Sequence, residues 1–248
     1  MSALIKPAKF VIKGPRLLPI LLILDTSASM QNERIAALNR AVRDMIEQCS
    51  KYCTRDTAIA VGVLAFNNSV TRILLDGESS FAIASHAKWT DLSANGGTCL
   101  NLALDEAKAL IDNPNTLPPN CYRPLVVLLT DGEPYPGWEE PMKRFSTEGR
   151  SGKCDRLAVM VGEERNLHPL EKFVEGTSNP VLRAKDPINL ERFFKLVTLT
   201  VTTRLVSRTP DVVVSLNPEK AQQRIDIGKD VAPESSVDDD DDDDLFLF

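Results

Sequence analysis

The chain has 248 residues, of which 43% are hydrophobic and 26% charged, which is enough for one sizeable core. Its formal charge of −6 comes from residues 238–244, which are seven consecutive aspartates, so the rest of the chain is close to neutral. A neutral body without a clustered basic face argues against direct nucleic-acid binding. The apolar run 17–24 is far shorter than the roughly 20 residues that span a bilayer, and no small-residue cleavage site follows it cleanly. We therefore expect a cytoplasmic protein that makes no membrane contact and whose five cysteines are reduced.

Continuous apolar segments predict strands that are buried on both faces, as in a parallel sheet covered by helices. They lie at residues 17–24, 57–66, 123–129 and 156–161. The segment 69–75 follows the second of them after only two residues. Because so short a connection makes a hairpin but not a parallel crossover, we expect an antiparallel strand at the sheet edge.

Helical patterns alternate with these strands. Apolar residues recur at helical spacing within residues 35–49 and 100–111, and again within 187–206. Residues 197–202 also alternate apolar side chains with threonine as a strand does, but the longer pattern favours a closing helix. The alternation predicts an α/β fold with a doubly wound, mostly parallel sheet, one antiparallel edge strand and helices on both faces.

The chain divides into four parts by composition. We predict an N-terminal extension (residues 1–14), one folded domain (15–206), a linker (207–237) and an acidic tail (238–248). The linker is polar and contains prolines, with one extended valine run that packs at most a short strand. Self-repulsion of the aspartates predicts that the tail is disordered.

Oxygen-bearing side chains follow the ends of two predicted strands. Asp25, Ser27 and Ser29 come at alternate positions after the first, and Asp131 follows the strand 123–129. Thr98 precedes the predicted helix 100–111. Because ligands of an open α/β sheet bind beyond the carboxyl ends of its strands, we expect these five residues to meet in one site. Two carboxylates and three hydroxyls are hard ligands, which favour Mg²⁺, Mn²⁺ or Ca²⁺ over Zn²⁺.

This order of residues, Asp-x-Ser-x-Ser followed by a distant Thr and a distant Asp, resembles the metal-ion-dependent adhesion site of von Willebrand factor A-type domains. The wider motifs Leu-Asp-Thr-Ser-x-Ser-Met, Gly-Gly-Thr and Leu-Thr-Asp-Gly-Glu-Pro are most similar to the bacterial tellurium-resistance-type members. The similarity covers about residues 15–206. All five site positions match, and Ala28 replaces the glycine often found between the two serines.

The resemblance implies both a fold and a function. Ser27, Ser29 and, in the ligand-bound form, Thr98 are implied to contact the metal directly, whereas Asp25 and Asp131 are implied to act largely through water. A partner protein's Asp or Glu completes the coordination, so the implied function is a metal-dependent interaction module or adaptor. The tellurium-resistance-type relatives suggest a bacterial or phage stress or defence assembly.

The nearest enzymatic alternative is a metal-dependent phosphatase of the haloacid-dehalogenase type, which also places an Asp after its first strand. Such enzymes use a second Asp two residues later as acid and base, and here that position is Ser27, a poor proton donor. The phosphate-binding loop, nucleophile elbow and H-E-x-x-H motifs are absent from the sequence. We therefore expect a binding module rather than an enzyme.

The last four residues, Leu245, Phe246, Leu247 and Phe248, form an apolar end to the acidic tail. An exposed apolar end is costly for solubility unless a partner receives it. The tail is similar in character to the Phe-terminated acidic tails of bacterial single-stranded-DNA-binding proteins, which dock into basic-rimmed pockets. We expect a second protein partner for it. Two alternatives stay open: the tail only solubilises the protein, or it occupies the metal site in cis.

Overall fold

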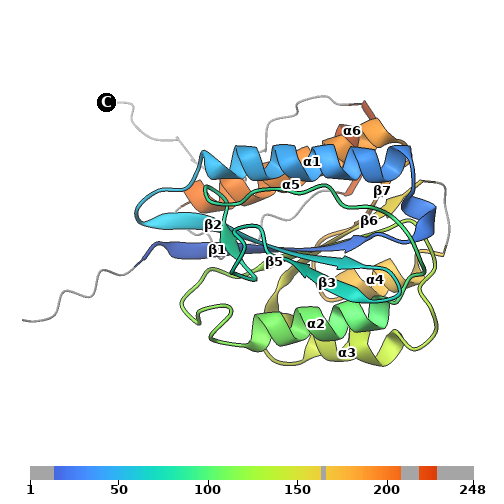
Figure 1. The fold of residues 1–248 in the computed structure, drawn as a ribbon, viewed down its shortest axis with the longest axis horizontal. Coiled ribbons are helices and arrows are strands. Elements are labelled where there is room, and N and C mark those ends of the chain that lie inside the picture. Colours follow the sequence, from blue (N-terminus) through green and yellow to red (C-terminus); the bar gives the residue numbers. More distant parts are fainter. Residues whose placement is uncertain (1–13, 163–165, 208–217, 228–248) are drawn as a thin grey trace, which may run out of the picture.

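The computed structural model describes residues 14–162, 166–207 and 218–227, and they form a seven-stranded sheet between two helical layers (Figure 1). The strands are β1 (Arg16–Asp25), β2 (Thr57–Phe66), β3 (Val70–Ile73), β4 (Ala82–Ile83), β5 (Leu125–Thr130), β6 (Asp155–Val161) and β7 (Val181–Ala184). Their order is β3-β2-β1-β5-β6-β7, and β4 also pairs with β2. β3 and β4 run antiparallel to β2, and all other pairs are parallel. The predicted doubly wound sheet with an antiparallel edge is confirmed.

Helices cover both faces of the sheet (Figure 1). One layer contains α1 (Glu33–Ser50), α5 (Pro187–Val206) and α6 (Pro218–Ile227), and the other contains α2 (Leu100–Asp112), α3 (Glu139–Thr147) and α4 (His168–Val174). Short 3₁₀ turns lie at Ala28–Met30 and Ser151–Lys153. The sheet therefore separates two apolar cores, one under each helical layer.

The apolar run of β1 explains why this strand lies in the middle of the sheet. The side chains of Leu18 and of Ile20 to Leu24 are fully buried, and Pro19 between them is buried too. Alternate residues face opposite layers, so that Leu22 packs under α1 and α5 while Leu21 and Ile23 pack under α2. A strand with apolar residues on both faces is stable only when both faces are covered.

Several elements were not predicted from the sequence, because they are short or have mixed patterns. These elements are β4, β7, α3 and α4. α6 lies inside the segment predicted to be a linker, where it packs against α5 and β7, and its Ala221 and Ile225 are buried. This part of the chain is therefore a packed helix, whose apolar face has too few residues to stand out. The valine run at 212–214, the N-terminal extension up to residue 13 and the tail 238–248 lie outside the described residues.

The strand order reverses next to β1. The chain passes from β1 through α1 to β2 on one side, and later from β5 to β6 and β7 on the other. Connections after β1 and β5 therefore diverge, which opens a crevice at the carboxyl ends of these neighbouring strands. Among the described helices, none combines the length and the apolar character needed to cross a membrane.

Candidate metal centre

The carboxyl ends of β1 and β5 carry the residues of the candidate metal centre, which we define as Asp25, Ser27, Ser29, Thr98 and Asp131. Asp25 is the last residue of β1, and Asp131 directly follows β5. Four of the five side chains are buried, whereas Ser29 is exposed. The site is therefore a buried set of oxygens with one open side.

Hydrogen bonds connect four members of the centre. The Oγ atoms of Ser27 and Ser29 lie 3.0 Å apart, and Ser29 Oγ donates to Asp131 Oδ1 over 2.6 Å. Asp25 Oδ1 accepts from the backbone N–H of Ser27 over 2.8 Å, which fixes the turn after β1. These contacts bring together residues that are 102 positions apart in the chain.

Thr98 belongs to a loop that is tied to the same turn. The backbone N–H of Ala28 donates to Gly96 O over 3.0 Å, and the N–H of Tyr135 donates to Thr98 O over 3.0 Å. The second bond comes from the loop after Asp131, so all three loops meet here. The hydroxyl of Thr98 makes no hydrogen bond with any residue that the structure describes, although Thr98 is only 7% exposed.

Two glycines make this loop possible. Gly96 has a φ of +74°, a conformation that other residues adopt at a cost. At Gly97 a Cβ atom would lie 2.1 Å from the hydroxyl of Tyr135, so any other residue here requires the exposed tyrosine side chain to move away from the backbone. Steric constraints on the backbone therefore explain the two glycines of the Gly-Gly-Thr motif.

Thr130 is a contact of the centre that sequence reasoning missed. Its Oγ1 donates to Asp25 Oδ2 over 2.5 Å. Burial raises the pKa of Asp25 from 3.8 to about 6, while hydrogen bonds from Ser27 and Thr130 oppose the shift. A buried carboxylate of this kind is stabilised in its ionised form when a cation binds beside it.

Arg34, in the first turn of α1, is the second residue that was missed. Its Nη1 donates to Asp131 Oδ2 over 2.6 Å and to Ser29 O over 3.3 Å. The side chain of Arg34 is 34% exposed and that of Asp131 is fully buried, so the ion pair closes one side of the centre. Both oxygens of Asp131 are thus engaged, one by a hydroxyl and one by a guanidinium.

The residues of the centre fit a hard divalent cation. Thr98 is a buried residue whose hydroxyl makes no hydrogen bond to the described residues and is not among the fully enclosed atoms, and Ser27 and Ser29 bond mainly to members of the centre itself. Hydroxyl hydrogens rotate freely, so these oxygens turn toward a cation without a backbone change. Within the described parts of the chain, no three His, Cys, Asp or Glu side chains gather as a metal-binding group.

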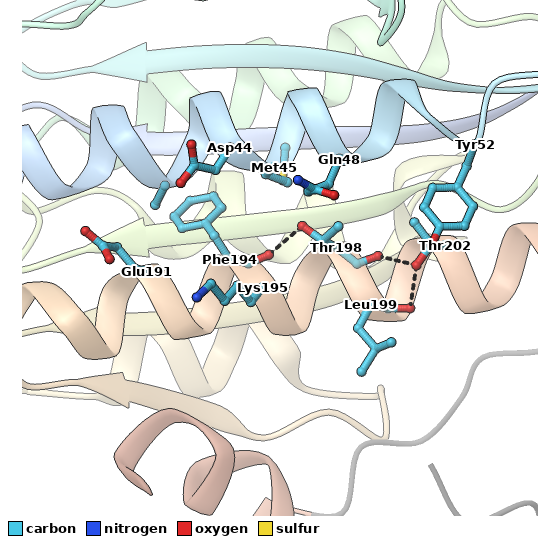
Figure 2. Close-up of a pocket in the computed structure, with 11 residues that line it drawn as sticks. Asp44, Met45, Gln48, Tyr52, Glu191, Phe194, Lys195, Thr198, Leu199 and Thr202 are labelled. Atoms are coloured by element: carbon cyan, nitrogen blue, oxygen red, sulfur yellow. Dashed lines mark hydrogen bonds between the residues drawn. The ribbon is translucent and has the colours of Figure 1, made fainter. Parts of the chain in front are cut away.

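A separate groove lies between α1 and α5 (Figure 2). It encloses about 380 Å³, and Met45, Tyr52 and Leu199 line it together with polar side chains. Figure 2 shows the hydroxyls of Thr198 and Thr202 turned back onto their own helix, where they donate to carbonyls over 2.8 to 3.2 Å. No predicted site residue lines this groove.

Residues 20–133 match the model of the von Willebrand factor type A domain. This segment includes all five residues of the candidate metal centre. The comparison with curated proteins found no match.

Several solved structures have the same fold. A von Willebrand factor type A protein from Catenulispora acidiphila has a TM-score of 0.60 at 20% identity, and the match covers 75% of this chain and 42% of that chain. Proximal thread matrix protein 1 from the mussel byssus, described with a zinc-occupied MIDAS motif, has a TM-score of 0.57 at 16% identity. The match covers 75% of this chain and 48% of that chain. The pilus adhesin SpaC from Lactobacillus rhamnosus GG has a TM-score of 0.60 at 12% identity, and the match covers 78% of this chain and 31% of that chain. The match spans less than half the length of each of these proteins, and at these identities it shows the fold alone.

Proposed function

Because the chain contains a von Willebrand factor type A domain, we propose that it is a metal-dependent protein-interaction module. Domains of this family often mediate metal-dependent interactions between proteins and are generally interaction modules rather than enzymes. In this proposal the five residues of the candidate metal centre hold a divalent cation, and a partner protein supplies an Asp or Glu side chain to it. A bound cation supplies an incompletely coordinated positive charge that attracts such a carboxylate.

One observation carries the proposal: the centre contains more neutral hydroxyls than carboxylates. Ser27, Ser29 and Thr98 add no negative charge, and the charge of Asp131 is already paired with Arg34. A cation held by this set keeps much of its charge, which favours an anionic oxygen from outside. The exposed position of Ser29 leaves the approach open.

The metal itself is part of the proposal. Hydroxyl and carboxylate oxygens suit Mg²⁺, with Mn²⁺ or Ca²⁺ as alternatives. The zinc named for the mussel byssus protein makes Zn²⁺ the comparison that a binding experiment must include. Calorimetric titration with each of the four ions ranks them directly.

The function is tested by isolating the protein with its partner. EDTA, or the double variant Ser27→Ala/Ser29→Ala, is expected to release a co-purifying protein while the domain stays folded. A matched control is Ser50→Ala/Ser146→Ala, because both of these hydroxyls bond only to carbonyls of their own helices. A complex that survives EDTA and the first double variant does not form through the metal centre.

We propose a second partner for the tail, through Leu245, Phe246, Leu247 and Phe248. The acidic run before this apolar end supports docking into a basic-rimmed pocket. Deletion of residues 245–248 is expected to remove one partner and to leave metal binding unchanged. Equal capture of every partner by the truncated chain contradicts this role.

The cellular setting also remains a proposal. The likeness of the site motifs to tellurium-resistance-type members supports a bacterial or phage stress or defence assembly in the cytoplasm. We further propose that the chain is not a phosphatase, because Ser27 stands where such enzymes need a second acid. Mg²⁺-dependent hydrolysis of a generic phosphate ester that Asp25→Ala abolishes would contradict this.

A further inference from the structure

Arg34 connects the candidate metal centre with a neighbouring hollow. On one side its Nη1 donates to Asp131 and to the backbone of Ser29. On the other side Arg34 lines a hollow of about 450 Å³, together with Val161 at the end of β6 and Lys185 after β7. One guanidinium therefore borders both the metal centre and the hollow.

The N–H groups of Arg34 that make no hydrogen bond in the described chain have the geometry that binds a carboxylate. A guanidinium carries five N–H groups in a fixed planar fork. Within the described residues only Nη1 of Arg34 makes hydrogen bonds, so Nε and Nη2 keep their donors, and the side chain is 34% exposed. Two parallel N–H groups on one edge match the two oxygens of a carboxylate.

The end of β6 makes room for the guanidinium at this place. A Cβ atom at Gly162 would lie 2.6 Å from Nη2 of Arg34. Gly162 also has a φ of +85°, which disfavours any other residue. Arg34 therefore lies between Asp131 and Gly162, whose lack of a side chain leaves space beside Nη2 and Nε, and the residue also lines the hollow.

We propose that Arg34 is a second recognition point for the partner, so that the site binds a pair of acidic side chains rather than one. The inference rests on the proposed metal-dependent function: the first acid binds the metal, and the second binds the Nε and Nη2 edge of Arg34. Lys185 is exposed on the same hollow and adds a second cation near that acid. The partner segment is then an acidic peptide whose two Asp or Glu residues are close in sequence.

The hollow is not basic overall, which makes the spacing of the two acids decisive. Glu33 and Asp186 also line it. Asp186 Oδ1 accepts from the backbone N–H of Asn189 over 2.8 Å and so caps α5. Because the cations and anions here are balanced, recognition depends on the placed donors of Arg34 and not on a general attraction for negative charge.

The test uses the full-length protein in saturating Mg²⁺ and a set of otherwise uncharged synthetic peptides. One peptide has a single Asp, and the others have two Asp residues that are adjacent or separated by one, two or six residues. Isothermal titration calorimetry is expected to give about tenfold tighter binding for one of the close spacings than for the single Asp. The six-residue spacing is expected to bind no better than two independent acids.

Variants assign the effect to Arg34. Arg34→Gln is expected to remove the advantage of the acid pair while the single-Asp peptide still binds in Mg²⁺. Arg40→Gln is the matched control, because Arg40 lies on the same helix and pairs with Glu191 instead. This control is expected to keep the full advantage.

Four results would overturn the inference. If the single Asp binds only with Mg²⁺ but no pair binds better, or if Arg34→Gln keeps the advantage, the second recognition point is wrong and the metal-dependent function stands. An advantage of the same size in EDTA places the acids away from the metal centre and contradicts the inference. If no peptide binds in Mg²⁺ at all, the proposed function fails together with it.

Discussion

The two ends of the parallel strands both bury charged side chains, but they use them differently. At the amino end, Asp155 and Arg156 open β6 and are 3% and 2% exposed. Arg156 donates to the carbonyls of Phe173 and Glu175, each over 2.6 Å, and Asn179 donates to Asp155 over 2.7 Å. These contacts fix one segment of backbone to another.

At the carboxyl end, the buried charge of Asp131 is paired with side chains that can reorient, and not with the backbone. Asp131 is engaged by the hydroxyl of Ser29 and by Arg34, and Thr98 has no hydroxyl partner among the described residues. Nη1 of Arg156 at the amino end also lacks a partner in the described chain, but this atom is enclosed. Buried charge alone therefore does not identify a ligand-binding site. A site needs uncommitted donors and acceptors that a ligand can reach.

Removing the charge of Asp25 at the carboxyl end is expected to have the largest effect, and the quantity that changes is the stability of the metal-free protein. Its pKa is about 6 in the folded protein and 3.8 without the fold, so the folded state holds the extra proton between these values. Metal-free stability therefore falls as the pH rises from about 4 to about 6, by roughly 3 kcal/mol in all. Asp25→Asn does not ionise: its amide oxygen still accepts from the Ser27 N–H, and its NH2 group donates to Thr130 Oγ1, which reverses that bond. In EDTA it is expected to equal the wild type near pH 4 and to exceed it at pH 7, as measured by urea unfolding. A difference that does not change with pH contradicts this account.

Removing the two serine hydroxyls comes next. Ser27→Ala/Ser29→Ala is expected to weaken Mn²⁺ binding at least about a hundredfold, equivalent to about 2.8 kcal/mol, because two oxygen ligands are lost. Stability in EDTA is expected to change little, since these hydroxyls bond mainly to each other and to the centre. Calorimetric titration and urea unfolding measure the two quantities. Unchanged Mn²⁺ affinity means that the metal binds elsewhere.

A change at the amino end is expected to give the opposite pattern. Asp155→Ala leaves a buried donor of Asn179 unpaired and is expected to cost about 2 kcal/mol of stability. The Mn²⁺ affinity of the folded variant is expected to equal that of the wild type. If Asp155→Ala lowers the metal affinity without lowering the stability, the amino end also contributes to metal binding and the proposed difference between the two ends of the strands is wrong.

The smallest expected effect comes from Arg34→Gln. The guanidinium neutralises Asp131, so its removal leaves more negative charge for a cation. Metal affinity is expected to rise about fivefold, equivalent to about 1 kcal/mol, in the same titration. Arg40→Gln, with its exposed partner, serves as the control and is expected to leave the affinity unchanged. Weaker metal binding by Arg34→Gln would mean that the arginine helps to hold the cation.

The sequence was sufficient to predict that these five residues lie together at one edge of the sheet, because alternate spacing and strand ends are local signals, and their role as metal ligands stays a prediction. It did not single out Arg34, which looks like an ordinary surface charge at the start of a helix. One signal was present: a cation in the first turn of a helix is unfavourable to the helix dipole and needs a reason. Thr130 was missed because a threonine that ends a buried strand is typical of many sheets.

The fold was predictable where apolar patterns are long. β1 and β2 have ten residues each and could be recognised alone, whereas β7 has four and depends on pairing with β6. α6 is stabilised by packing of Ala221 and Ile225 against other elements, which no local pattern reveals. Tertiary contacts, not propensity, decide such short elements.

The central claim is that a metal held by this centre receives a carboxylate, and sequential calorimetry tests it most directly. EDTA-treated protein is titrated with Mn²⁺ and then with acetate, and the same titration of Ser27→Ala/Ser29→Ala is subtracted, because residues 238–244 also attract cations in both proteins. The account predicts one Mn²⁺ per chain in the difference, and acetate binding only after Mn²⁺ is bound. Acetate that binds equally well without Mn²⁺, or a difference with no bound Mn²⁺, would contradict it.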